Sequence, residues 1–157
     1  RLSAAYKGVM ALILKAGAQD FISGGPMDFT VFLAEGTDIH HIFPQAYCEK
    51  QGYKSKKWNS IVNKTPLFAR TNRIIGGSAP SKYLQKIEKD DHVLNVELDN
   101  FVSTHKIDVL ALRQDDFQGF FLNRAKSLLD LISSAMGKPV SNRDSEDVIE
   151  SYGTSLL

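Results

Sequence analysis

The spacing of apolar side chains predicts a helix near each end of the chain. Residues 3–16, SAAYKGVMALILKA, repeat apolar positions at the helical period, with Ser3 placed to cap the first turn and Gly17 after the last. Residues 117–136, FQGFFLNRAKSLLDLISSAM, carry a similar stripe behind two aspartates that can cap it. We therefore expect one helix near the start and one long helix in the C-terminal half.

The middle of the chain contains two short runs typical of strands. One strand is expected near residues 39–43, kept short by a glycine before it and by Pro44 after it. A second strand is expected near residues 61–67, which Pro66 interrupts. The polar stretch between them, residues 45–60, is expected to be a long connection of the kind that carries function when it is ordered.

Further helices are expected after the second strand. Residues 69–75, ARTNRII, open a helix that the following GGSAP stops, and residues 78–89 start another with Pro80 in the first turn. Residues 92–112 hold shorter helical pieces. Beyond Val140 the chain is polar, and we expect a loosely ordered tail there.

Together these elements predict an α+β fold, in which a helix-rich domain encloses a small two-stranded antiparallel hairpin. The 157 residues, 43% of them hydrophobic and 24% charged, suit one domain with its own core. We divide it into an N-terminal helix and loop (1–36), the hairpin segment (37–89), C-terminal helices (90–140) and a tail (141–157). Because the sequence opens on Arg1, we expect the C-terminal fragment of a longer protein.

Cysteine content and hydropathy bear on the compartment. Cys48 is the only cysteine in the sequence, which excludes an internal disulfide and a Cys-rich zinc site. No apolar run in the sequence approaches the about 20 residues that span a bilayer, and no secretory signal is recognisable. We therefore expect a cytoplasmic protein without membrane contact and without structural zinc.

The net charge of +1 conceals a strong asymmetry. Residues 50–89, the basic segment, contain ten Lys and Arg and one acid, Glu88, so they carry +9, while the remainder carries −8. Such a segment is either a solvated surface or a surface that faces a polyanion, and so lopsided a block favours the second. Tyr53 and Trp58 lie among these lysines, either to stack on bases or to anchor the core. DNA is therefore the predicted partner.

Residues with catalytic chemistry lie on the elements around the basic segment. His40 and His41 fall on the first strand, Asn63 on the second, and Asn72 on the following helix. A strand, a long loop, a strand and a helix with these residues are the layout of an HNH, or ββα-metal, nuclease. Phosphodiester cleavage needs a general base that takes a proton from the attacking water, and a divalent cation that offsets negative charge. It also needs a fixed geometry for in-line attack. Neutral imidazole can take the proton, and imidazole nitrogen and amide oxygen can share a cation with phosphate.

Two stretches resemble a known family. DIHHIFPQAY (38–47) and NSIVNKTPLFARTNRIIGGSAPSKYL (59–84) are similar to the C-terminal HNH domain of the GmrSD-type modification-dependent restriction enzymes. The resemblance extends to the related phosphorothioate-sensing nicking enzymes of bacterial anti-phage systems. DFQGFFLNRAKSLLDLISSAMGK (116–138) is also similar to the last helix of the family. In that family an N-terminal nucleotide-hydrolysing domain precedes this one, so the resemblance implies such a partner in the same protein.

The family pattern implies a role for each motif residue. By resemblance, His40 is a metal ligand and His41 is the general base. Asn63 matches the middle asparagine, which ties the loop to the base and orients it, and Asn72 matches the second metal ligand. Residues 37–89 would then form the ββα-metal core. Because the last motif residue is Asn where many HNH enzymes use His, Mg²⁺ is the expected cofactor, with Mn²⁺ as the alternative.

Other residues keep two interpretations each. Asp38 either supports a histidine ligand or forms a turn, and Lys64 and Arg73 either clamp phosphate or are solvated. His92 and His105 lie outside the motif and are expected at the surface or at helix ends. The residues expected to contact DNA are Lys54, Lys56, Lys57, Lys64, Arg70 and Arg73.

The functional prediction is a metal-dependent DNA endonuclease or nickase domain of a bacterial anti-phage restriction system. One alternative is a catalytically inactive module whose basic segment grips DNA. Another is a module whose acidic C-terminal helices dock on a partner domain. The sequence contains no Gly-rich phosphate loop, so we expect no nucleotide hydrolysis by this chain alone.

Overall fold

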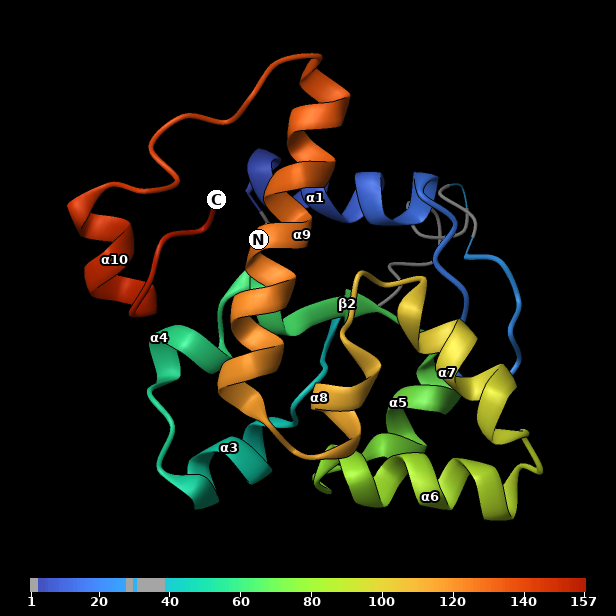
Figure 1. The fold of residues 1–157 in the computed structure, drawn as a ribbon. Coiled ribbons are helices and arrows are strands. Elements are labelled where there is room, and N and C mark those ends of the chain that lie inside the picture. The colour runs from blue at the N-terminus through green and yellow to red at the C-terminus, as the bar shows by residue number, and fades with distance from the viewer. Residues whose placement is uncertain (1–2, 28–29, 31–38) are drawn as a thin grey trace.

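The structure, a computed structural model, describes residues 3–27, 30 and 39–157. Within these residues the fold is helix-rich with a two-stranded antiparallel sheet (Figure 1), which confirms the expected class at this level. In chain order the elements are α1 (Ala4–Lys15), β1 (Ile39–His41), α3 (Gln45–Gln51), α4 (Ser55–Trp58), the 3-10 helix η1 (Ile61–Asn63), β2 (Lys64–Pro66), α5 (Ala69–Ile75), α6 (Pro80–Asp90), α7 (Asn95–Ser103), α8 (Val109–Arg113), α9 (Phe117–Met136) and α10 (Glu146–Tyr152).

The expected capping residues set the starts of the main helices. The Ser3 hydroxyl accepts a hydrogen bond from the Tyr6 amide at the start of α1 (3.1 Å). The Asp116 carboxylate accepts one from the Gly119 amide at the start of α9 (3.0 Å). Pro80 occupies the first turn of α6, where its missing N–H costs no helical bond. These short-range signals were sufficient to predict where the helices begin.

Two segments contain helices that the sequence did not reveal. The connection between the strands holds α3, which ends at Gly52 in a left-handed conformation (φ 77°), and the single turn α4. The expectation of a loosely ordered tail is wrong, because α10 forms there and Leu156 is buried. The ring of Tyr152 stacks on Phe121 of α9 at 5.6 Å, so α10 lies against that helix.

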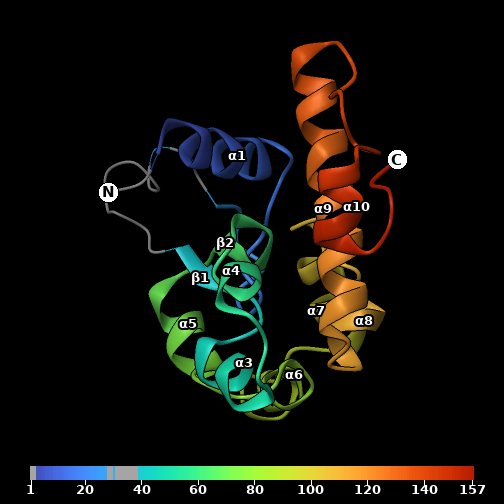
Figure 2. The ribbon, with the colours of Figure 1, turned by 90° about the vertical axis from the view of Figure 1, so that its left-hand side faces the viewer.

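Helix α9, the long helix of residues 117–136, lies along one side of the molecule (Figures 1 and 2). It packs against α1, η1 and α8, while α6 contacts α5, α7 and α8. A quarter turn of the molecule shows the strands together with α3, α4 and α5 on one side of α9 (Figure 2). Strand β2 packs against α1, and Arg124 of α9 donates to its Lys64 carbonyl at 2.7 Å.

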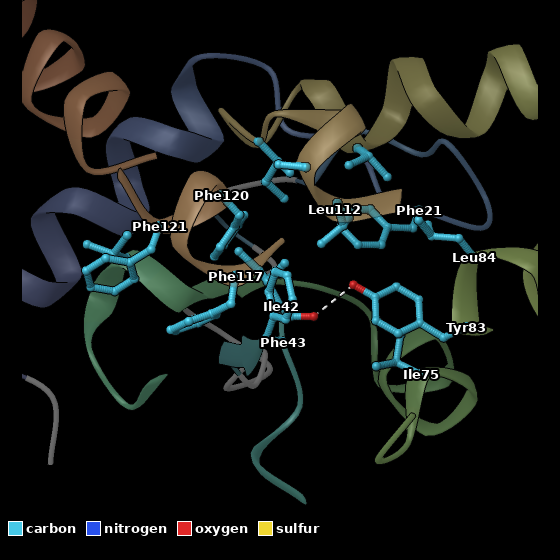
Figure 3. Packing of buried hydrophobic residues seen from close by; sticks show 14 of the residues in the cluster. Phe21, Ile42, Phe43, Ile75, Tyr83, Leu84, Leu112, Phe117, Phe120 and Phe121 are labelled. Carbon is cyan, nitrogen blue, oxygen red and sulfur yellow. Dashed lines mark hydrogen bonds between the residues drawn. The ribbon is translucent and has the colours of Figure 1, made fainter. Parts of the chain in front are cut away.

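Aromatic residues fill the core directly behind β1. The Phe43 ring meets Phe117 and Phe120 of α9 at centroid distances of 5.2 and 4.9 Å. The Tyr83 hydroxyl donates to the Ile42 carbonyl at 2.8 Å, as the dashed line in Figure 3 shows. Trp58 is buried in the same core, and Tyr53 stacks on Phe117 at 4.7 Å. Trp58 is therefore a core anchor, Tyr53 packs against the core while partly exposed, and the end of β1 is fixed by packing.

Among the described residues, the structure contains no helix whose length and apolar character would allow it to cross a bilayer.

Candidate active site

The two strands set the positions of the histidines. β1 pairs antiparallel with β2 in the register Ile39↔Pro66, His40↔Thr65 and His41↔Lys64. His40 is 7% exposed, whereas His41 is only partly buried. Helix α5 follows β2 after two residues and carries Asn72. Two antiparallel strands and a helix thus bring three of the predicted site residues into one region.

An open pocket of about 370 Å³ joins these residues. Its wall contains His40 and His41 from β1 and Asn72 from α5, together with Ile39, Pro44, Gln45, Ala46, Gly76 and Gly77. Neighbouring residues of a strand usually point to opposite faces. Here both histidines reach the same pocket because the strand ends at His41 and the chain turns into Pro44.

Two glycines, Gly76 and Gly77, line the pocket between α5 and α3. Helix α5 ends at Gly76, whose backbone has a φ of 55°, as expected for a residue that breaks a helix. A Cβ on Gly77 would lie 3.1 Å from the Ala46 Cβ on α3. Small residues here allow the two helices to approach each other across the pocket.

Asn63 is fully buried and ties the loop to the end of β1. Its Oδ1 accepts from the Phe43 amide at 2.8 Å, and its Nδ2 donates to the carbonyls of Phe43 (3.0 Å) and Trp58 (2.8 Å). The described part of the pocket wall does not include Asn63. Its hydrogen bonds tie Phe43, two residues after His41, to Trp58 at the end of α4, which corresponds to the loop-tying part of its predicted role.

The side chain that contacts His41 directly is Asn59, which the sequence motif did not indicate. The His41 Nε2 lies 3.1 Å from the Asn59 Oδ1. The Trp58 ring stands edge-on to the imidazole, with centroids 5.6 Å apart. His41 is thus held between the loop before η1 and Lys64, its partner on β2.

Burial lowers the pKa of His41 below its usual 6.5. The hydrogen bond to Asn59 raises this pKa and opposes the effect of burial, while the positive charge of Lys64 lowers it further. Near neutral pH the His41 imidazole is therefore neutral and able to accept a proton. Burial also lowers the pKa of Lys64, whose Nζ lies 5.5 Å from the centroid of the Tyr6 ring.

The cations expected to contact DNA have different surroundings. Lys54, Lys56 and Arg73 are exposed. Lys57 lies over the Phe121 ring, 5.9 Å from its centroid. Arg70 forms an ion pair with Asp91 at 2.5 Å, although its side chain remains 62% exposed. The exposed cations on α4 and α5 are thus the ones most available to a polyanion.

The residues that line the pocket include a histidine, His40, and an asparagine, Asn72, whose side chains are of types that can bind a metal. The described residues hold no cluster of three or more His, Cys, Asp or Glu side chains able to bind a metal. Asp38 lies outside the described residues. Mg²⁺ usually keeps several waters and binds one or two carboxylates together with phosphate oxygens. The described residues that line the pocket include no Asp or Glu, so a Mg²⁺ site remains a prediction.

Buried polar residues that sequence reasoning missed support α5 from behind. Asp20 accepts from the Phe68 amide at 3.1 Å and from the Thr71 hydroxyl at 2.7 Å. These bonds fix the first turn of α5, which carries Asn72 one residue after Thr71. No local sequence pattern indicates this role, because Asp20 lies in a loop far from the motif.

His105 and Arg124 support β2 from the other side. His105 lies at a helix end, as expected, directly after the C-cap residue of α7. It is not at the surface, because it is fully buried and bonds the Thr65 hydroxyl (2.6 Å) and the Gln19 carbonyl (2.7 Å). The Arg124 guanidinium donates to the carbonyls of Val62 and Lys64, both at 2.7 Å. A charged residue inside the apolar stripe of α9 was the one available signal for this role. His92 is exposed, as expected.

Comparison with known proteins shows a partial similarity to a protein of uncharacterized function. Neither a protein-family model nor a solved structure matches the chain. Over 85 residues the chain is 35% identical to "Uncharacterized protein MJ0686" of Methanocaldococcus jannaschii. The match covers 54% of this chain and 14% of that protein, so the chain corresponds to a small part of its relative.

Proposed function

We propose that this chain is a metal-dependent DNA endonuclease or nickase domain of the HNH class. The observation that carries the proposal is the pocket in which His40 and His41 of β1 meet Asn72 of α5, beside an antiparallel strand pair. The order of strand, loop, strand and helix is the order that a ββα-metal element requires. The resemblance to restriction enzymes suggests an anti-phage role beside a nucleotide-hydrolysing domain.

In this proposal His41 is the general base. Its neutral imidazole accepts a proton from water, and the water oxygen forms a bond to phosphorus as the bond to the 3′ oxygen breaks. His40 and Asn72 would hold the divalent cation. Such a cation offsets the negative charge that develops on the phosphate and on the departing 3′ oxygen. Asn63 fixes the backbone around the base through its three buried hydrogen bonds.

The basic segment supplies the DNA contacts in this proposal. Lys64 pairs with His41 across the strands, and Arg73 follows Asn72 on α5, so both belong to the elements that carry the proposed site. Exposed Lys54 and Lys56 extend the positive surface along α4. Contacts of this kind bind the backbone and carry no sequence information.

Nicking of supercoiled plasmid, with and without Mg²⁺ or Mn²⁺, tests the proposal. We expect His41→Ala to lower cleavage by roughly 10²–10⁴-fold, the usual contribution of a general base, with divalent binding retained. His40→Ala and Asn72→Ala should instead weaken divalent binding in calorimetric titrations. His92→Ala changes an exposed histidine outside the pocket and serves as the matched control.

The pattern of failures distinguishes the proposal from its alternatives. DNA binding without divalent-dependent nicking by the wild-type chain would identify an inactive binding module. If His41→Ala loses the ion while His40→Ala keeps it, the two roles are reversed. Nicking at the wild-type rate by all three variants would contradict the nuclease assignment.

A further inference from the structure

We infer that Asn59 is a positioning residue that holds His41 in one tautomer, with the proton on Nε2 and the lone pair on Nδ1. Asn59 belongs to no motif, and its contact with His41 is visible only in the folded chain. The catalytic consequence rests on the proposed function, because it assumes that His41 is the base. The tautomer itself can be measured without any assay of cleavage.

The chemistry of the contact determines which nitrogen carries the proton. The His41 Nε2 faces the Asn59 Oδ1 at 3.1 Å, and an amide oxygen can only accept a hydrogen bond. In a neutral imidazole one nitrogen is a donor and the other an acceptor. The Nε2 is therefore the donor, and the Nδ1 is the nitrogen able to take a proton from water. A base that spends part of its time as the other tautomer has its acceptor on the wrong nitrogen.

The loop around Asn59 is held well enough to impose this choice. The Asn59 amide donates to the Ser55 carbonyl at 2.8 Å and closes the turn of α4. The preceding residue, Trp58, is buried, and its carbonyl accepts from the Nδ2 of Asn63 at 2.8 Å. The Trp58 ring also lies edge-on to the imidazole. The backbone that carries Asn59 is thus anchored in the core, while its side chain reaches outward to His41.

This arrangement gives the two asparagines separate tasks. Asn63 bonds backbone groups and is fully buried, so its loss disturbs the fold. Asn59 is exposed and bonds the imidazole, so its loss should leave the fold intact and change the imidazole alone. The separation makes Asn59 suitable for a test in which structure and tautomer are read independently.

Long-range ¹H–¹⁵N correlation spectra of the uniformly ¹⁵N-labelled chain test the tautomer at alkaline pH, where imidazoles are neutral. For the wild-type chain we expect the His41 Nε2 at a protonated-nitrogen shift and its Nδ1 at an unprotonated-nitrogen shift. Asn59→Ala should bring both shifts toward a common average. Asn59→Asp keeps an acceptor in place and should preserve the wild-type pattern. Asn123→Ala, an exposed asparagine of α9, is the control and should change neither shift.

Plasmid nicking tests the effect of the Asn59–His41 contact on catalysis. We expect Asn59→Ala to lower kcat by roughly 2–10-fold, the effect of one ordinary hydrogen bond, with KM unchanged. Asn59→Asp should restore much of the loss. An unprotonated Nε2 in the wild-type chain, or unchanged shifts in Asn59→Ala, would overturn the inference. If the shifts behave as expected but the wild-type chain nicks no DNA, the positioning contact stands and the proposed nuclease function fails.

Discussion

At the scale of single residues, the surroundings of His41 depend on asparagine side chains with different burial. The Asn63 amide makes three hydrogen bonds to backbone groups inside the core. A buried backbone group that loses its partner costs about 1–3 kcal/mol, whereas an exposed group exchanges its partner for water. The same amide group therefore has different energetic importance at positions 59 and 63.

We expect Asn63→Ala to lower the free energy of unfolding by roughly 2–4 kcal/mol, because it leaves the Phe43 amide and two carbonyls without partners. The matched variant Asn59→Ala should cost less than about 1 kcal/mol, since its hydrogen bond is exposed. Urea denaturation of both variants measures the difference. Equal losses would contradict the assignment of Asn63 as the buried tie of the loop.

His105 should make stability depend on pH. Burial lowers its pKa from 6.5 to about 4, and the nearby Arg124 charge lowers it as well, against the opposing effects of the Gln19 carbonyl and Asp20. Between about 4 and 6.5 the unfolded chain binds a proton at this residue and the folded chain does not. The free energy of unfolding should therefore fall as the pH drops through this window, by about 3 kcal/mol in total.

Denaturation in urea at several pH values checks this expectation. His105→Gln should remove this part of the pH dependence, although it also lowers stability by disturbing the contacts with Thr65 and Gln19. His92→Gln changes an exposed histidine and should retain the wild-type slope. If the free energy of unfolding of His105→Gln still depends on pH as in the wild-type chain, another titratable group causes the dependence.

At the scale of elements, the position of α5 depends on a residue from a distant loop. Asp20 bonds the Phe68 amide and the Thr71 hydroxyl, and it also accepts from the amides of Ile22 and Ser23 in its own turn. One carboxylate thus fastens the N-terminal loop to the helix that carries Asn72. Asp116, the cap of α9, is the exposed counterpart with a single local bond.

Asp20→Asn should lower the free energy of unfolding by roughly 1–3 kcal/mol, because an amide nitrogen would face donors that the carboxylate now accepts from. Asp116→Asn should have almost no effect, since Asn caps helices as well as Asp does. Thermal or urea unfolding compares the two. If both variants lose the same free energy of unfolding, Asp20 is an ordinary turn residue and does not stabilise the position of α5.

Local signals explain which elements the sequence could predict. Ser3, Asp116 and Pro80 act within their own first turn, so their helices could be located from short stretches. The same reasoning missed α3 and α4, because their polar surfaces resemble a loop and their stability comes from residues such as Cys48 and Trp58 packing on the core. α10 was missed although Ser145 caps it and Glu146 and Asp147 follow in its first turn, because a polar stretch near the end of the chain resembles a loosely ordered tail.

The site could be predicted only where it rests on the motif. His40, His41 and Asn72 were identified from residue types in order, and the structure brings them to one pocket. Asn59 and Arg124 were missed because their partners are 18 and about 60 residues away in the chain. No pattern of neighbouring residues in the sequence indicates such long-range contacts. Their roles follow from the tertiary structure.

At the scale of the whole molecule, the basic segment includes α4, β2 and α5, and α5 contributes Asn72 to the pocket wall. α4 and α5 both flank the strand pair (Figure 2). Lys56 on α4 and Arg73 on α5 are exposed, whereas Arg70 already has a carboxylate partner in Asp91. Affinity for DNA that arises from such cations should depend steeply on salt and little on sequence.

We expect the double variant Lys56→Ala/Arg73→Ala to weaken binding to all duplexes alike. It should also reduce the log–log dependence of affinity on salt by about 2, or ~0.9 for each lost phosphate contact. Lys7→Ala/Lys138→Ala removes two exposed cations outside the basic segment and should leave that slope unchanged. Fluorescence anisotropy of a labelled duplex across salt concentrations measures both. If the salt dependence of affinity is unchanged in Lys56→Ala/Arg73→Ala, DNA binds to another surface of the protein.

The bonds of Arg124 to the backbone of β2 have a consequence for the time at which the site forms during synthesis. Ribosomes deliver the chain N-terminus first, at roughly 5–20 residues per second. Arg124 is therefore synthesised several seconds after Val62 and Lys64, the residues whose carbonyls accept hydrogen bonds from its guanidinium. A nascent chain already contains both histidines and both motif asparagines, but it lacks the support of α9. Any cleaving activity should therefore be withheld from unfinished chains and arise only once the long helix has left the ribosome.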